Sequence, residues 1–311
     1  MKKYYIGIFI LLLSVSACSK KSLPGKNASL QTQEFPPELV HFKPYKNNPV
    51  FTGTGRDTWD RTIRERGYIL KEGDSFSMWY TGYNEDREDT HYLGYATSAD
   101  GINWTRYADN PIFKKSWVED MMIVKHEGIY YMFAEGRNDI AHWLTSIDKI
   151  HWKEQGPLDI RQSDGKPISP GPYGTPTVWI ENGKWYLFYE RNDLGVWLAT
   201  STDHKTWTNV QDEPVLKMGP TVYDQKGLAL NQVIKYKGKY YGYYHATAYD
   251  PWRDWTTNVA VSDDLIHWKK YPHNPIVSGN KSSGITVFDG KQFRLYTMHP
   301  DVRVYFPSKD K

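Results

Sequence analysis

The 311-residue chain has little cysteine, little excess charge of either sign and no long apolar segment. Because Cys18 is its only cysteine, the chain cannot form an internal disulfide. A formal net charge of +3 at pH 7 gives no electrostatic reason to expect a nucleic-acid partner. The one apolar run, residues 6–15, is too short to span a membrane as a helix. The remaining composition, 39% hydrophobic and 24% charged, is ordinary for a globular protein of one large or two small domains.

The apolar run at the N-terminus has the features of a secretory signal, since two lysines precede it and small residues follow it. The sequence VSAC, which ends at Cys18, resembles a bacterial lipobox, in which the cysteine becomes the lipid-modified first residue. We therefore expect a signal peptide over residues 1–17, a lipid anchor on Cys18, and a location in the bacterial cell envelope, at the outer membrane or in the periplasm. Residues 18–40, rich in Lys, Ser, Asn, Gln and Pro, predict a flexible tether.

Aromatic residues are abundant, with 13 Trp, 24 Tyr and 11 Phe, and they suit a β-rich core. Many of them lie in a repeat. The pattern Ser-x-Asp-x-x-x-Trp occurs four times, beginning at Ser98, Ser146, Ser201 and Ser262. A glycine turn followed by an aromatic run occurs five times, at Gly128, Gly183, Gly238 and Gly290 and in the variant KEGDSFSMWYTG. Glycine between two alternating runs predicts a β-hairpin.

Each repeat unit predicts one blade of four antiparallel strands. The fifth unit, from about residue 284, lacks its outer strand, while NNPVF at residues 47–51 ends like NPIF and NPIV in other units. We therefore expect an all-β fold over residues 41–311, a single five-bladed β-propeller closed by an N-terminal strand. The Ser and Asp of the motif are expected to bond turn amides, and its Trp to pack between blades.

Function is expected where the blades differ. In a propeller, the starts of the first strands and the ends of the second strands meet on one face. Seven residues past three of the glycines stand Glu135, Glu190 and His245. Near the starts of the first strands stand Glu65 and Arg66 in blade one, Asp120 in blade two and Thr175 in blade three. Asp60 lies just upstream of Glu65. Carboxylates gathered in this way are costly unless they are used or paired. The arginines could instead neutralise them as structural ion pairs.

Two segments carry a resemblance to a known group of proteins. They are WVEDMMIVKHEGIYYMFAEG, residues 117–136, and GTPTVWIENGKWYLFYERND, residues 174–193. They resemble the five-bladed propeller glycoside hydrolases, chiefly family 43, with families 32, 117 and 130 as relatives. The resemblance implies a base on blade one, an orienting Asp on blade two and an acid Glu on blade three. Asp120 matches the orienting residue. Glu65, or else Asp60, would be the base. Glycine and threonine stand where family 43 has its acid, so Glu190 is the expected substitute, with His245 as another possibility.

These features predict an inverting, exo-acting glycoside hydrolase that releases a terminal sugar from an oligosaccharide of plant or algal origin. Inversion needs two carboxyl groups roughly 6.5–9.5 Å apart. Glu65, Asp120 and Glu190 are the expected catalytic residues. The expected substrate-binding residues are Asp60, Arg66, Glu135, Thr175 and His245. No cofactor or metal is expected, and the protein is expected to be a monomer. Two alternatives stay open: a non-catalytic glycan-binding lipoprotein, and a glycoside phosphorylase, which would need a basic phosphate pocket.

Overall fold

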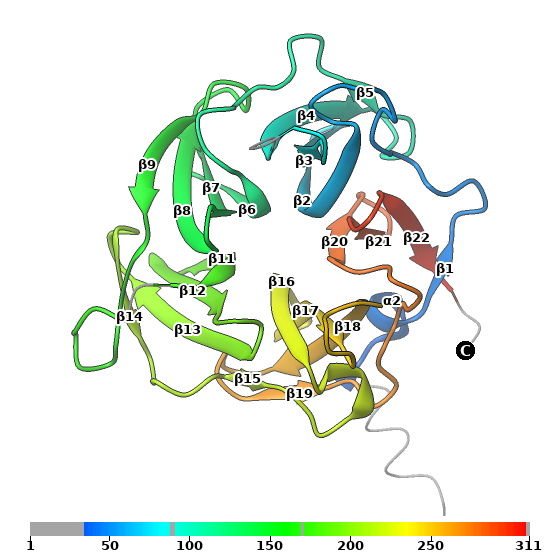
Figure 1. Ribbon diagram of the computed structural model, residues 1–311. Coiled ribbons are helices and arrows are strands. Elements are labelled where there is room, and N and C mark those ends of the chain that lie inside the picture. The colour runs from blue at the N-terminus through cyan, green and yellow to red at the C-terminus, as the bar shows by residue number, and fades with distance from the viewer. Residues whose placement is uncertain (1–33, 88–90, 169–170, 309–311) are drawn as a thin grey trace, which may run out of the picture. The chain divides into compact units, whose positions relative to one another are not determined.

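The computed structural model describes residues 34–87, 91–168 and 171–308, of which residue 35 onward forms one compact unit. Within these residues the strands form five separate sheets arranged in a ring, with one strand of each sheet facing the axis (Figure 1). The fold is therefore the five-bladed β-propeller that the repeats predict. The signal peptide, Cys18 and most of the tether lie outside the described residues. No helix in the described part is long and apolar enough to cross a bilayer.

The blades follow one another along the chain. Blade one contains β2 (Thr62–Glu72), β3 (Ser75–Tyr83), β4 (Tyr92–Ser98) and β5 (Thr105–Arg106). Blade two contains β6 (Glu119–His126), β7 (Ile129–Gly136), β8 (Ile140–Ser146) and β9 (Lys153–Pro157). Blade three contains β11 (Gly174–Glu181), β12 (Lys184–Glu190), β13 (Gly195–Ser201) and β14 (Thr206–Asn209). Two short strands extend it, because β10 (Asp159–Arg161) pairs with β14 and β15 (Leu216–Lys217) pairs with β13.

Blade four contains β16 (Gly227–Tyr236), β17 (Lys239–Thr247), β18 (Thr256–Ser262) and β19 (Trp268–Lys270), and a short 3-10 helix, η1 (Val222–Asp224), precedes it. Blade five contains β20 (Ile285–Phe288), β21 (Phe293–Thr297) and β22 (Arg303–Pro307), and its outer strand is the N-terminal β1 (Phe42–Pro44). The two ends of the described chain thus meet in one sheet. This pairing closes the ring and covers an edge that would otherwise be open.

The closing strand lies earlier in the chain than the sequence suggests. Residues 47–51 were expected to form it, but β1 ends at Pro44. The NPVF segment pairs with blade five only through an isolated antiparallel bridge between Phe51 and Val302, and its Asn has a structural role that it shares with its equivalents. The Asn48 side chain accepts from the backbone N–H of Val304 and donates to its carbonyl, both at 2.9 Å. Asn110 and Asn274 bond the third strands of blades one and four in the same way. This recurring amide bridge explains why the segment repeats.

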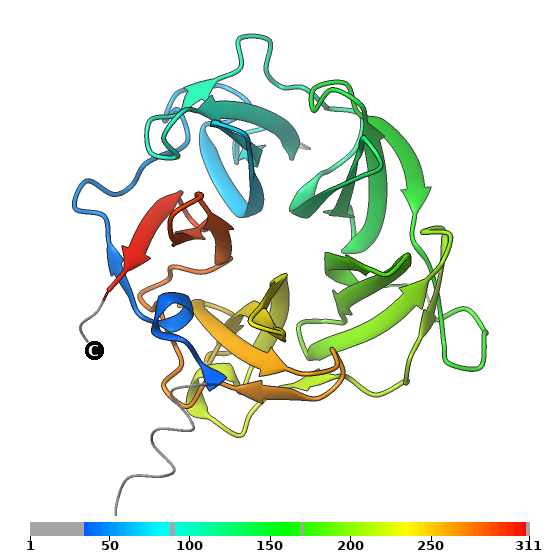
Figure 2. The same ribbon diagram turned by 180° about the vertical axis from the view of Figure 1, so that it is seen from behind.

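The folded part also begins before residue 41, where the tether was expected to end. A one-turn helix, α2 (Pro37–Val40), lies beside the strands of blade four (Figure 2). Phe35 and Leu39 are buried, and the ring of Phe35 lies 5.0 Å from that of Tyr271. Tyr243 donates a hydrogen bond to the Leu39 carbonyl at 2.9 Å. Burial of these apolar side chains fixes a segment whose composition alone suggests flexibility.

The Ser-x-Asp-x-x-x-Trp motif is structural, as expected. In its first copy the Ser98 hydroxyl accepts from the N–H of Gly101, and the Asp100 carboxylate accepts from the N–H groups of Ile102 and Asn103. The other copies repeat most of these bonds. Trp152 lies edge-on to Trp79 of blade one, at 6.2 Å between ring centroids. Three of the four motif tryptophans contact the preceding blade in this way, which joins neighbouring sheets.

Candidate active site

A cavity of about 380 Å³ opens on the axis at the starts of the inner strands, and all five blades contribute to it. Six of the predicted site residues line it: Glu65, Asp120, Glu135, Thr175, Glu190 and His245. The starts of the first strands and the ends of the second strands therefore meet on one face, as expected, at these six positions. In Figure 1 the inner strands β2, β6, β11, β16 and β20 converge on the centre of the ring, and residues at or next to their starts line the cavity.

The inner strands share an irregularity at the point where they reach this cavity. The register with the second strand shifts between Arg64 and Tyr68 in blade one, and at the matching place in blades two, three and four. Glu65, Asp120 and Thr175 have left-handed backbones there, with φ of 59°, 43° and 43°. Such a conformation is uncommon for these residue types, most of all for threonine. Bulges of this kind redirect side chains and are frequent beside active sites.

Glu65 and Asp120 lie side by side in this ring. Arg64 donates to Oε1 of Glu65 from Nε at 2.8 Å and from Nη2 at 2.7 Å. Burial, aided by the Asp120 charge, raises the pKa of Glu65 to about 7 against the opposing effect of Arg64. Asp120 accepts from the backbone N–H of Arg66 at 2.9 Å, and burial raises its pKa although the positive Arg66 acts in the opposite direction. Glu65 thus titrates near neutral pH.

Glu135 and Glu190 converge from blades two and three on Gly174. A Cβ atom at position 174 would lie 1.9 Å from Oε2 of Glu135 and 2.6 Å from Oε1 of Glu190, so both carboxyls occupy space that a larger residue would fill. Thr175 N–H donates to Glu135 at 2.9 Å, and Asp193 N–H donates to Glu190 at 2.5 Å. Burial raises the pKa of Glu190 to about 7, and burial with the nearby like charges raises that of Glu135 well above its usual range. Protonated carboxyl groups are therefore present here at neutral pH.

Histidines on the opposite wall are neutral. Burial, together with the Arg66 charge, lowers the pKa of His245 to about 3, and burial lowers that of His299 to about 4. Nδ1 of His245 lies 2.8 Å from the side-chain amide of Asn231. At neutral pH His245 carries no acidic proton of useful strength. It suits a hydrogen bond to a hydroxyl and does not suit the role of general acid that the sequence left open for it.

Two predicted substrate-binding residues do not reach the cavity. Arg66 is completely buried beneath it and donates to carbonyl oxygens on β6, β11 and β16. Asp60 is buried against Arg106, whose Nε lies 3.0 Å from Oδ2, and it also accepts from Thr58 and Tyr80. Arg66 therefore joins four blades at the axis, whereas Asp60 has its partners in blade one and in the segment that precedes it. Neither residue contacts the cavity, so their predicted contact with substrate was wrong. The same geometry excludes Asp60 as an alternative base.

The structure adds residues that sequence reasoning missed. Asp193 follows β12 and lines the cavity, and burial with the Glu190 charge raises its pKa well above its usual range. Trp252 lies at the cavity with half its surface exposed, and its Nε1 donates to the Lys226 carbonyl at 3.1 Å. Both stand in loops whose lengths differ between blades, so the repeat gives no register for them. Arg64, next to Glu65, could have been found from its position in the repeat.

The charge of the cavity is strongly one-sided. Carboxyl groups from seven described residues line it: Glu65, Glu119, Asp120, Glu135, Asp139, Glu190 and Asp193. Arg64 is the one Arg or Lys among the described lining residues. Burial, with the charges of Glu65 and Asp120, raises the pKa of Glu119 to about 9. Within the described part of the chain, no group of three or more His, Cys, Asp or Glu residues is placed to hold a metal ion.

Comparison with known proteins finds the same fold in solved glycoside hydrolases. No family model matches the chain. Its fold is the five-bladed β-propeller of solved glycoside hydrolases. One of these belongs to family 130, a family of mannoside phosphorylases that contains hydrolases targeting β-1,2 mannosidic linkages in Candida mannan. Its TM-score is 0.68, with 16% identity over 86% of this chain and 94% of that one. Another is a β-1,2-mannobiose phosphorylase from Listeria innocua in complex with β-1,2-mannobiose. Its TM-score is 0.62, with 15% identity over 85% of this chain and 95% of that one.

A curated sequence relative is also a glycoside-processing enzyme. It is a 1,2-β-oligomannan phosphorylase from Thermoanaerobacter sp. (strain X514), 26% identical over 226 residues, which cover 67% of this chain and 72% of the relative. The resemblance carried by the sequence is chiefly to family 43, with family 130 as a relative. These comparisons support the broader group and do not establish the particular likeness to family 43.

Proposed function

We propose that this protein is an inverting, exo-acting glycoside hydrolase that removes a terminal mannose from β-1,2-linked mannosides. The substrate class is supported by the relatives, whose names refer to β-1,2-mannosides, and it replaces the expected plant or algal oligosaccharides. An exo action is supported by the floor of the cavity, because Arg66 fills the axis beneath it with hydrogen bonds to three other blades. A blind cavity of this size admits the end of a glycan and not its middle.

The observation that favours hydrolysis is the seven carboxyl groups facing a single Arg64. A phosphorylase must bind inorganic phosphate next to the sugar, and phosphate at neutral pH carries between one and two negative charges. Binding it requires cationic donors, and the described lining of the cavity offers Arg64 alone, while those carboxyls that are ionised would repel it. Water has no charge and can be activated by a carboxylate. The names of two relatives favour phosphorolysis, which is therefore the second candidate.

In the proposed mechanism Glu190 donates its proton to the glycosidic oxygen as the bond to the anomeric carbon breaks. Glu65 accepts a proton from water as the water oxygen attacks that carbon from the opposite side. A pKa of about 7 suits both tasks near neutral pH, because each group is then partly in its reactive form. Asp120, between them in blade two, would orient a hydroxyl of the sugar. Glu135, Thr175 and His245 would bind the other hydroxyls.

The deciding experiment is a proton NMR time course with β-1,2-mannobiose, in buffer free of phosphate and again with phosphate. The proposal expects mannose in both, with the anomer opposite to the substrate's formed first. Mannose 1-phosphate formed only with phosphate would establish phosphorolysis, and no product in either would refute the substrate class. Glu65→Gln and Asp120→Asn are each expected to lower turnover by about 10²- to 10⁴-fold. Full turnover in both variants would overturn these assignments.

We further propose that the protein is attached to the bacterial cell envelope through a lipid on Cys18. Support for this comes from the sequence around Cys18, where lysines, an apolar run and small residues occur in the order of a lipoprotein signal. A tether between Cys18 and the first buried residue, Phe35, would leave the catalytic unit outside the bilayer.

A further inference from the structure

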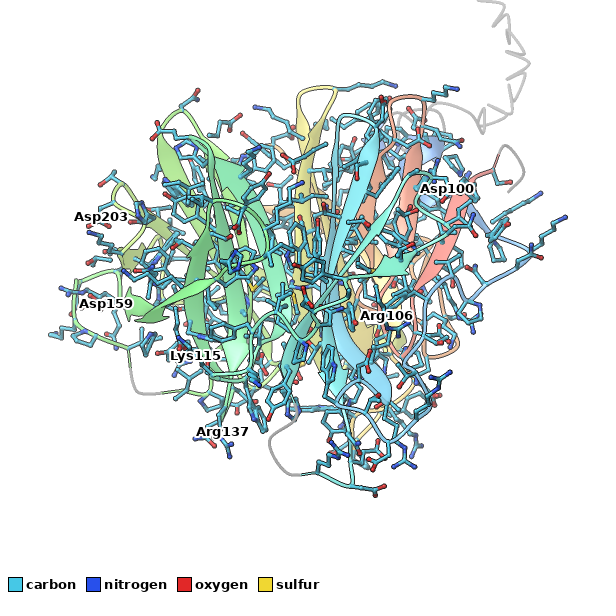
Figure 3. All side chains as sticks on the ribbon, turned by 90° about the horizontal axis from the view of Figure 1, so that it is seen from above. Asp100, Arg106, Lys115, Arg137, Asp159 and Asp203 are labelled. Atoms are coloured by element: carbon cyan, nitrogen blue, oxygen red, sulfur yellow. The ribbon has the colours of Figure 1, made fainter. Side chains whose placement is uncertain are left out.

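A second cavity, of about 440 Å³, lies between blades one and two and is lined by cations and aromatic rings. Lys114, Lys115 and Trp117 come from the segment that joins β5 to β6. Arg137 comes from the turn between β7 and β8, two residues after Glu135. Glu135 lines the axial cavity described above, which we call the carboxylate cavity. Figure 3 shows Lys115 and Arg137 on the same side of the molecule. We call the second cavity the basic groove.

A stack of three side chains connects the linings of the two cavities, since His91 lines the first and Trp117 and Arg137 line the basic groove. The ring of His91, which lines the carboxylate cavity, lies 3.7 Å from that of Trp117 with an angle of 26° between the planes. The guanidinium carbon of Arg137 lies 4.9 Å from the centre of the Trp117 ring. Stacking on an aromatic face holds a guanidinium while its edge can still donate hydrogen bonds. The basic groove therefore begins one ring's thickness from the carboxylate cavity.

The ionisable side chains of the two neighbouring cavities are of opposite kinds, chiefly acidic in the first and chiefly basic in the second. Glu154 is the single carboxylate among the described residues of the basic groove, and it already bonds His142 and Ser116, each at 2.9 Å. Lys114 and Lys115 are exposed, and no carboxylate of the described residues forms a salt bridge with either. Exposed lysines contribute little to folding, so the stability of the propeller does not account for this arrangement. A ligand that lies across both cavities would be neutral at one end and acidic at the other.

We propose that the basic groove binds an acidic group, a carboxylate, sulfate or phosphate, carried by a sugar unit of the glycan whose neutral end enters the carboxylate cavity. Lysine binds such groups as a point charge, and Lys114 and Lys115 supply two such charges at the groove. The inference rests on the proposed function for its choice of a glycan. Its test measures binding, so that it can fail separately from the test of hydrolysis.

The experiment is a titration of the full mature protein, followed by calorimetry and by NMR, with mannose 6-phosphate, glucuronic acid, mannose and inorganic phosphate. We expect the two acidic sugars to bind saturably and mannose to bind more weakly. The double variant Lys114→Gln/Lys115→Gln should lower the affinity for the acidic sugars by roughly three- to tenfold, the size expected for two exposed charge contacts. The matched control Lys205→Gln/Lys291→Gln, which removes two exposed lysines elsewhere, should not change their binding.

Salt supplies a second measurement, because screening at high ionic strength weakens contacts between exposed charges. Acidic-sugar affinity should fall when sodium chloride rises from 0.05 to 0.5 M in the wild type and much less in the double variant. The groove lysines touch no predicted reacting atom, so the double variant should turn over neutral mannobiose like the wild type. Equal binding by both double variants would overturn the proposal. Phosphate binding as tight as that of mannose 6-phosphate would show a free-anion site and overturn the assignment to a glycan.

Discussion

Replacing Arg66 with methionine tests the main correction that the structure makes to the sequence. Arg66 lies in β2. Its side chain donates to carbonyl oxygens on three other blades, those of Met121 at 3.0 Å, Pro176 at 2.8 Å and Leu230 at 2.9 Å. It also donates to the hydroxyl of Thr177 at 2.8 Å. One side chain therefore joins four of the five inner strands at the axis. Methionine is similar in length and apolar, so it would keep much of the packing and remove every one of these bonds.

The magnitude follows from the acceptors left behind. Each buried acceptor without a partner costs about 1–3 kcal/mol, and removing one member of a buried charge arrangement costs about 3–5 kcal/mol in total once water and relaxation are included. We take about 4 kcal/mol as the loss in the free energy of unfolding. In a domain of this size 1 kcal/mol shifts the melting temperature by about 2–4 °C, so the expected decrease is on the order of 10 °C.

The assay is thermal unfolding followed by circular dichroism, with a urea titration to give the free energy. Arg61→Met is the matched control, because Arg61 forms an exposed pair with Asp86 and its loss should cost less than about 1 kcal/mol. If Arg66→Met melts within 2 °C of the wild type and only its KM for a glycan rises, our reasoning is refuted. Arg66 would then bind substrate, as its place in the repeat suggests.

Three further predictions concern pH, substrate contact and lipid attachment. The pKa values of Glu65 and Glu190 are about 7 in the folded protein, against 4.5 for an ordinary glutamate. The stability that their protonation contributes is therefore complete below pH 4.5 and is lost as the pH rises through 7. The melting temperature should fall between pH 5 and 8, and a rise would contradict the assigned pKa directions. Trp252→Ala should raise KM for oligosaccharides by about tenfold with little change in kcat, while Trp252→Phe retains most of the affinity, because a half-exposed ring at the cavity can lie against a sugar face; equal KM values for all three proteins would exclude this contact. Cys18→Ser should abolish the mass increase of lipidation and release the protein from membranes, as mass spectrometry and fractionation would show, and an unmodified Cys18 in the wild type would refute the anchor.

Much of the fold follows from the sequence because the repeat is written in local interactions. A glycine that permits a tight turn, a Ser-Asp pair that bonds turn amides and a Trp that packs sideways each act within a few residues. Their spacing was enough to predict five blades and a closing N-terminal strand. It also predicted that Glu135, Glu190 and His245 would lie on one face, because strands of equal length end at equal heights. The outer strand itself was placed a few residues too late, since a three-residue strand has almost no sequence signal.

The ring and the height of each strand end therefore follow from local sequence. Which side chains face the cavity depends on how the five blades pack together. Glu65 and Arg66 are neighbours in the chain, yet a bulge directs the first into the cavity and the second beneath it. Asp193 and Trp252 reach the cavity from loops that have no counterpart in the repeat. The raised pKa values of the carboxyls arise only when residues from different blades are buried together. Direction, burial and mutual charge are properties of the assembled ring, and no local pattern encodes them.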